Sequence, residues 1–139
     1  MRLEITKLKR ILLVDDDNIN NFINQRLIKK LNIAEEVSVA VNGEEAIKTI
    51  MNANNEHWPE LILLDINMPV MNGFEFLEEY KKLDIPNKDN VVIVMLTTST
   101  NQNDMARSKD IPIRGFLNKP LTEDKLEKIM KDYFGNNSN

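Results

Sequence analysis

Five short apolar runs divide the chain into regular segments. They lie at Ile11–Val14, Val37–Val41, Leu61–Leu64, Val91–Leu96 and Gly115–Leu117. The length of these runs fits β-strands, and the consecutive Leu, Ile and Val residues favour strands that are buried on both faces. We therefore predict five strands, with strand three ending at a Pro- and Gly-marked loop that begins near Met68.

The segments between the runs have the spacing of amphipathic helices, because apolar residues recur every three or four positions. The first stripe comprises Ile19, Phe22, Ile23, Leu27 and Leu31. Later stripes comprise Ala46, Ile47, Ile50 and Met51, then Phe74, Leu77 and Tyr80, and finally Leu121, Leu126, Ile129, Met130 and Tyr133. Thr122 is the expected N-cap of the last helix. The polar segment Asn101–Asp110 predicts a short, marginal helix. Alternating strands and helices predict an α/β fold with a doubly wound parallel sheet.

Composition is that of an ordinary globular domain, with 42% hydrophobic and 29% charged residues over 139 positions. There is no cysteine, which excludes disulfides and thiolate metal sites. The net charge of −4 argues against a nucleic-acid partner. No aliphatic run approaches the ~20 residues that span a bilayer. We expect a cytoplasmic protein without a membrane partner, built as an N-terminal extension at 1–8, one domain at 9–134 and a frayed tail at 135–139.

Carboxylates follow two of the predicted strands. Asp65 stands where the third run stops, and Asp15, Asp16 and Asp17 follow the first run directly. Parallel strands would bring these groups to the same edge of the sheet, where ligands bind. Three adjacent carboxylates need a cation or strong solvation, and oxygen ligands suit Mg²⁺. The alternative is that the run caps the following helix, where the dipole favours anions.

A hydroxyl and an ammonium group follow two further strands. Thr97 ends the fourth run, although the stretch Thr97–Thr100 offers several hydroxyls, and Thr97 could also be a helix N-cap. Lys119 stands between the fifth run and Pro120, where the alternative is a solvated strand-end lysine. A cis Lys-Pro bond would aim the lysine across the edge. Together these groups form a phosphoryl site in which cations neutralise the oxygens and a carboxylate attacks in line.

The same motifs resemble a known family. V-D-D after the first strand, L-D-I-N-M-P-x-M-x-G at Leu64–Gly73, T after the fourth strand and K-P after the fifth closely resemble the receiver domains of bacterial two-component response regulators. The resemblance covers about residues 9–134. It implies a five-stranded sheet in the flavodoxin-like order 2-1-3-4-5, with helices on both faces.

The resemblance also implies a role for each matching residue. Asp65 would accept the phosphoryl group from a histidine kinase or a phosphotransfer protein. Asp15, Asp16, Asp65 and the backbone carbonyl of Asn67 would hold Mg²⁺. Lys119 would contact the phosphoryl group, Thr97 would be the switch hydroxyl, and Phe116 would be the switch aromatic residue.

The implied function is a signalling switch or phosphorelay receiver that catalyses only its own phosphoryl transfer and dephosphorylation. A downstream protein would bind the face formed by the fourth helix, fifth strand and fifth helix, and the domain would be a monomer or weak dimer. Too few residues follow Phe134 for a DNA-binding module, so we expect a stand-alone receiver. Two other functions are a constitutive docking module and an aspartate-nucleophile phosphatase. Asn67 disfavours the phosphatase, which needs an aspartate there as general acid.

Overall fold

A computed structural model describes residues 4–5, 7–53, 58–85, 90–98 and 113–136. In this part of the chain, five strands form one parallel sheet: β2 (Leu8–Val14), β3 (Ala34–Ala40), β4 (Leu61–Asp65), β5 (Val92–Thr97) and β6 (Gly115–Asn118). Their order across the sheet is β3-β2-β4-β5-β6. This is the predicted order 2-1-3-4-5 of a doubly wound sheet, so the predicted fold class is confirmed.

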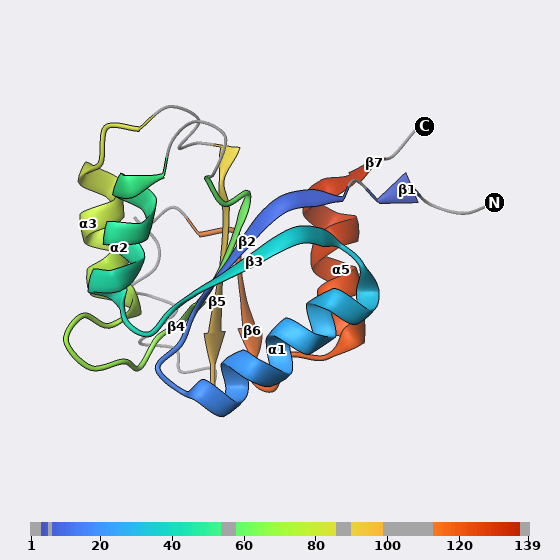
Figure 1. Ribbon diagram of the computed structural model, residues 1–139, viewed down its shortest axis with the longest axis horizontal. Coiled ribbons are helices and arrows are strands. Elements are labelled where there is room, and N and C mark those ends of the chain that lie inside the picture. The colour runs from blue at the N-terminus through green and yellow to red at the C-terminus, as the bar shows by residue number, and fades with distance from the viewer. Residues whose placement is uncertain (1–3, 6, 54–57, 86–89, 99–112, 137–139) are drawn as a thin grey trace.

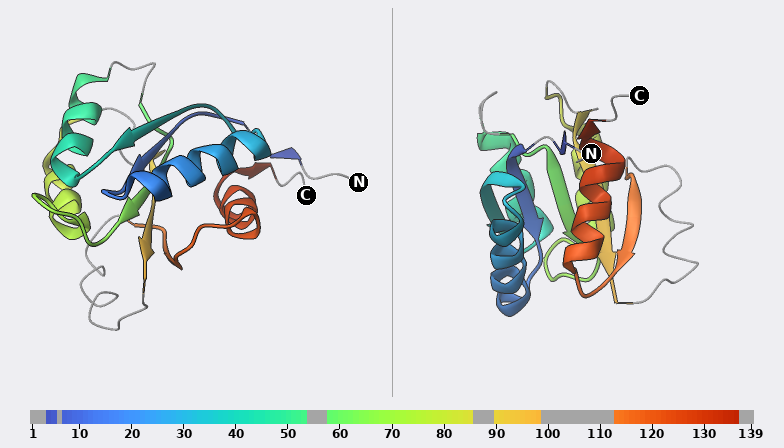
Figure 2. Two further views of the ribbon diagram at one scale, coloured as in Figure 1. Left: turned by 60° about the horizontal axis from the view of Figure 1, so that its bottom comes forward. Right: turned by 90° about the vertical axis from the view of Figure 1, so that its right-hand side faces the viewer.

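Helices cover both faces of the sheet. The described helices are α1 (Asn18–Leu31), α2 (Gly43–Asn52), α3 (Gly73–Lys82) and α5 (Glu123–Phe134). Helices α1 and α5 lie against one face, and α2 and α3 lie against the other (Figures 1 and 2). None of these four is long and apolar enough to cross a membrane. The helix expected at 101–110 lies outside the described residues.

Each face of the sheet has its own hydrophobic core. Along β2 the side chains alternate, so that Ile11 and Leu13 join the cluster under α1 and α5, while Leu12 and Val14 join the cluster under α2 and α3. All five residues of β4 are buried. The central strands therefore hold the residues at their carboxyl ends in fixed positions.

The predicted apolar stripe of α1 is only partly correct. Leu27 and Leu31 pack against the core, but the side chains of Ile19, Phe22 and Ile23 are 70%, 58% and 52% exposed. An α-helix turns about 100° per residue, so residues spaced by four drift by about 40° each time and the first and last members of the stripe lie about 120° apart. The inner face of the first turns instead carries Asn21 and Asn24.

The two ends of the described domain are paired with one another. Strand β2 begins at Leu8, which is fully buried, so the sheet includes the last residue of the expected extension at 1–8. Strand β1 (Glu4–Ile5) then pairs antiparallel with β7 (Gly135–Asn136), so the start of the expected frayed tail at 135–139 is ordered. A Cβ at residue 135 would clash with the carbonyl oxygen of Lys131, and glycine permits this close exit from α5.

Candidate phosphoryl site

The candidate site lies at the edge where the parallel strands end. Strand β2 leads into Asp15 and Asp16, β4 ends at Asp65, β5 ends at Thr97, and Lys119 follows β6. The carboxyl ends of parallel strands meet at one edge of a sheet. The fold therefore brings Asp15 into contact with Lys119, which is 104 positions away in the sequence.

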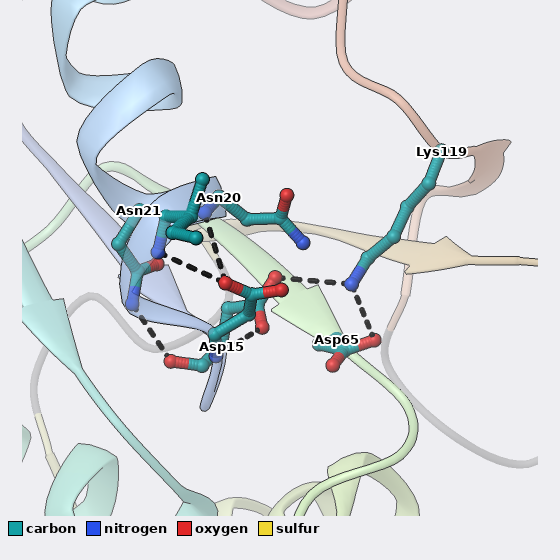
Figure 3. A network of polar contacts seen from close by, with 7 residues as sticks. Asp15, Asn20, Asn21, Asp65 and Lys119 are labelled. Carbon is teal, nitrogen blue, oxygen red and sulfur yellow. Dashed lines mark hydrogen bonds and ion pairs between the residues drawn. The ribbon is translucent and has the colours of Figure 1, made fainter.

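The Lys119 ammonium group lies between two carboxylates. Its Nζ atom is 3.0 Å from Asp15 Oδ2 and 3.1 Å from Asp65 Oδ1 (Figure 3). The backbone N–H of Lys119 donates to the carbonyl oxygen of Thr97 at 2.7 Å, and the Lys119-Pro120 peptide bond is cis. Lys119 is therefore part of the cluster and is not a solvated strand-end lysine.

Three carboxylates form a cluster that fits a metal ion. Asp15, Asp16 and Asp65 each offer an oxygen, and these oxygens lie within 4.8 Å of one another. Asp15 and Asp65 are buried, while Asp16 is exposed. With Lys119, the ionised carboxylates leave a net charge of −2, which a divalent cation would balance. Oxygen donors of this kind are those that Mg²⁺ prefers, so the residues fit this ion.

The charges of the site shift two pKa values. Burial raises the pKa of Asp65 above its ordinary value; the Lys119 ammonium group opposes this rise, and Asp15 and Asp16 add to it. Burial alone would lower the pKa of Lys119, but the hydrogen bond to Asp15 and the negative charges of Asp65 and Asp15 outweigh burial and raise it. Lys119 therefore stays protonated, and the carboxylates outnumber the cations.

The three consecutive aspartates at 15–17 divide between helix capping and the metal-binding cluster, the two roles that the sequence left open. Asp17 is the N-cap of α1, and its side chain accepts hydrogen bonds from the backbone N–H groups of Ile19 and Asn20 at 2.9 and 3.2 Å. Asp15 Oδ1 accepts from the N–H of Asp17 at 2.9 Å. One aspartate therefore caps the helix, and the other two face the cluster with Asp65.

Sequence reasoning missed the contribution of Asn21. This residue is 4% exposed, and its side-chain nitrogen donates to the carbonyl oxygen of Asp15 at 2.8 Å (Figure 3). The bond fixes the backbone of the carboxylate that contacts Lys119. Four Asn residues, at 18, 20, 21 and 24, in the first half of a predicted amphipathic helix were the available signal.

The loop after β4 is held close to the phosphoacceptor candidate. Asn67 is exposed two residues after Asp65. The backbone N–H of Gly73, the first residue of α3, donates to the carbonyl oxygen of Ile66 at 2.9 Å. A Cβ at residue 73 would lie 2.6 Å from the carbonyl oxygen of Asp65. Helix α3 therefore starts against the backbone of Asp65 itself.

The two candidate switch residues lie on neighbouring strands. Thr97 is 4% exposed at the end of β5, while Thr98 is exposed, and residues 99 and 100 of the hydroxyl run lie outside the described residues. Phe116 pairs with Met95 in the register of β5 and β6, and packs against the cluster on the α2 and α3 face. It is half-buried.

Comparison with known proteins gives a consistent family. Residues 11–131 match the family model of the response regulator receiver domain. The chain is 33% identical over 119 residues to two-component response regulator 24 of Arabidopsis thaliana. The aligned region covers 86% of this chain and 79% of that protein. It is 31% identical over 126 residues to response regulator Rcp1 of Synechocystis, and the aligned region covers 88% of this chain and 84% of that protein. Much longer proteins also match. The chain is 29% identical to a segment that makes up 8% of hybrid signal transduction histidine kinase L of Dictyostelium discoideum.

Solved structures show the same fold. A two-component response regulator from Cytophaga hutchinsonii superposes with a TM-score of 0.80 at 30% identity, covering 91% of this chain and 97% of that one. The phosphorylated cyanobacterial phytochrome response regulator RcpA superposes with a TM-score of 0.71 at 29% identity, covering 90% of each chain.

Proposed function

Since this chain belongs to the family of response regulator receiver domains, we propose that it is a phosphorylation-activated signalling switch or phosphorelay receiver with Asp65 as the phosphoacceptor. One observation carries the proposal: the Lys119 ammonium group bridges Asp15 and Asp65 at the edge of the sheet. A buried carboxylate beside a fixed cation is arranged to receive an anionic group. A histidine kinase or phosphotransfer protein is the expected donor.

The residues of the site have distinct parts in the transfer. A carboxylate oxygen of Asp65 attacks the phosphorus in line, and the bond between phosphorus and the donor imidazole nitrogen breaks. Lys119 donates to the phosphoryl oxygens once its bond to Asp65 is exchanged, and the hydroxyl of Thr97 donates to them from the end of β5. Asp15, Asp16, Asp65 and the carbonyl of Asn67 would hold Mg²⁺, whose positive charge would offset repulsion between the carboxylates and the phosphoryl group.

We expect phosphorylation to change the surface that a downstream protein binds. We expect the new charge on Asp65 to draw Thr97 inward and Phe116 to move toward the space that Thr97 leaves. Both residues lie on β5 and β6, so we expect the downstream face to include β6 and α5; the fourth helix of the predicted face lies outside the described residues. The protein would act in the cytoplasm as a signalling module and would not turn over other substrates.

Intact-protein mass spectrometry after incubation with acetyl phosphate tests this function. We expect an added phosphoryl mass that requires Mg²⁺ and is absent from Asp65→Asn. Turnover of generic phosphate esters by the wild type would support the phosphatase instead. A downstream partner that binds the unmodified protein and Asp65→Asn equally would support the docking module.

A further inference from the structure

Lys125 contacts the backbone on both sides of Lys119. Its ammonium group donates to the carbonyl oxygen of Asn118 at 2.6 Å and to that of Pro120 at 3.0 Å. The backbone N–H of Lys119 in turn donates to Thr97 at 2.7 Å. The peptide group between Asn118 and Lys119 is therefore held by β5 through its N–H and by α5 through its carbonyl oxygen, and α5 also holds the carbonyl group of Pro120.

The position of Lys125 in its helix is unusual for a cation. Thr122 is the N-cap of α5, and its hydroxyl accepts from the backbone N–H of Lys125 at 3.3 Å, so Lys125 belongs to the first turn. The helix dipole favours anions there, as Glu123 and Asp124 illustrate, and disfavours a lysine. The two carbonyl contacts compensate for this local cost.

The two contacts contribute more to geometry than to stability. Asn118 and Pro120 are exposed residues, so water can solvate their carbonyl oxygens when Lys125 is removed. Water does not hold the two carbonyls at a fixed separation from one another. The ammonium group does, because both hydrogen bonds share one nitrogen atom.

We propose that Lys125 is a positioning residue for Lys119: by holding the carbonyl groups of Asn118 and Pro120, it fixes the backbone from which Lys119 reaches the phosphoryl group on Asp65. The role rests on the proposed function, because it assumes that Lys119 contacts the phosphoryl group. It also links the first turn of α5, a helix of the expected downstream face, to the reacting site. Nothing in the role requires Lys125 to touch the phosphoryl group.

The test is a ¹⁹F NMR titration with beryllofluoride and Mg²⁺, a probe that mimics the phosphoryl group on Asp65. The variants are Lys125→Met, which removes both bonds, Lys125→Arg, which retains donors, and Lys128→Met, which removes an equal charge from the exposed face of α5. We expect Lys125→Met to bind beryllofluoride about tenfold more weakly, because displacement of a positioned group costs this order of effect. The arginine and Lys128 variants should bind as the wild type does.

A second readout separates positioning from general damage. Calorimetric titration with Mg²⁺ alone should show that Lys125→Met binds the ion no more weakly than the wild type, because Asp15, Asp16 and Asp65 do not contact Lys125. Wild-type beryllofluoride affinity in Lys125→Met would overturn the inference. A loss of equal size in Lys125→Arg or Lys128→Met, or a parallel loss of Mg²⁺ affinity, would overturn it too. A wild-type protein that binds no beryllofluoride would overturn the proposed function itself, and the inference with it.

Discussion

Three carboxylates and one ammonium group share the edge of the sheet, and their balance determines how Asp65 behaves. Lys119 contacts Asp15 and Asp65 at nearly equal distances, so its charge is divided between them. The carboxylates remain in excess, and burial further disfavours the ionised form of Asp65. This arrangement of charges is therefore electrostatically costly, and costly charge clusters of this kind are typical of functional sites.

The role of Lys119 predicts two separable defects in Lys119→Ala. Loss of the cation should slow phosphorylation by acetyl phosphate about a hundredfold, the usual effect of removing a donor that stabilises developing charge. The phosphorylated variant should also fail to gain affinity for a downstream partner, because the link between the anion and the loop after β6 is lost. Mass spectrometry and partner binding measure the two effects. Lys128→Ala is the matched control, and normal partner binding by phosphorylated Lys119→Ala would contradict the prediction.

The raised pKa of Asp65 predicts a pH-dependent stability difference. The folded state favours protonated Asp65, so this group stabilises the fold below the pKa of the unfolded chain, and the contribution is lost as pH rises through the folded pKa. Asp65→Asn has no proton to lose. We expect a larger free energy of unfolding for the variant than for the wild type at neutral pH, with a smaller difference in acid. Urea unfolding of both proteins at neutral and at acidic pH measures this difference in free energy. A variant that is less stable than the wild type at neutral pH would contradict the prediction.

At the scale of elements, helix starts and strand ends determine the site together. Asp17 sets the first residue of α1, Gly73 sets that of α3, and Lys125 lies in the first turn of α5. Each of these residues contacts or adjoins a segment that carries a candidate functional side chain. The position of each helix is therefore coupled to the geometry of the site.

Helix α3 supplies a prediction at Gly73. An alanine within a helix ordinarily stabilises it by about 1 kcal/mol relative to glycine. Here the Cβ would lie 2.6 Å from the carbonyl oxygen of Asp65, so Gly73→Ala should instead destabilise the protein by about 1–3 kcal/mol, the range of overpacking. Phosphorylation by acetyl phosphate should slow as the backbone of Asp65 moves. Glu78→Ala, an exposed change in the same helix, is the control, and a stabilised Gly73→Ala would contradict the predicted clash.

Helix α1 supplies a prediction about the donor. Ile19, Phe22 and Ile23 expose apolar side chains directly after the aspartates of the site, and Phe22 also lines an open groove between α1 and β3. We expect a phosphohistidine donor to approach Asp65 along this face and to contact these three residues. Their triple substitution by alanine should slow transfer from a phosphohistidine protein about tenfold or more, as loss of interface anchors does. Phosphorylation by acetyl phosphate should be unchanged, and equal slowing with both donors would refute the contact.

At the scale of the whole molecule, the candidate site and the β1–β7 pair lie at opposite edges of the sheet. The carboxyl ends of the strands carry the site, while β1 and β7 pair beyond the amino end of β2 (Figure 1). The terminal pair contacts α5 but no residue of the acidic cluster. Stability and phosphorylation should therefore respond separately to changes at the termini.

Removal of residues 1–6 tests this separation. The truncation removes the pairing with Gly135 and Asn136, and it should lower the free energy of unfolding by about 1–2 kcal/mol, the net value of a few backbone hydrogen bonds. Hydrogen exchange at the amides of residues 135 and 136 should accelerate. The rate of phosphorylation by acetyl phosphate is expected to match that of the full chain, and a reduced rate would show that the termini influence the site.

The sequence alone determined the fold class, the strand order through the family resemblance, and the residues that gather at the edge of the sheet. It could do so because strand ends are local features and parallel strands necessarily bring their carboxyl ends together. Only the tertiary structure decided which aspartate caps α1, which side of α1 faces the core, and that β1 pairs with β7. It alone revealed the contacts of Asn21 and Lys125. These outcomes depend on helix rotation and on distances between separate segments, which the spacing of apolar residues does not encode.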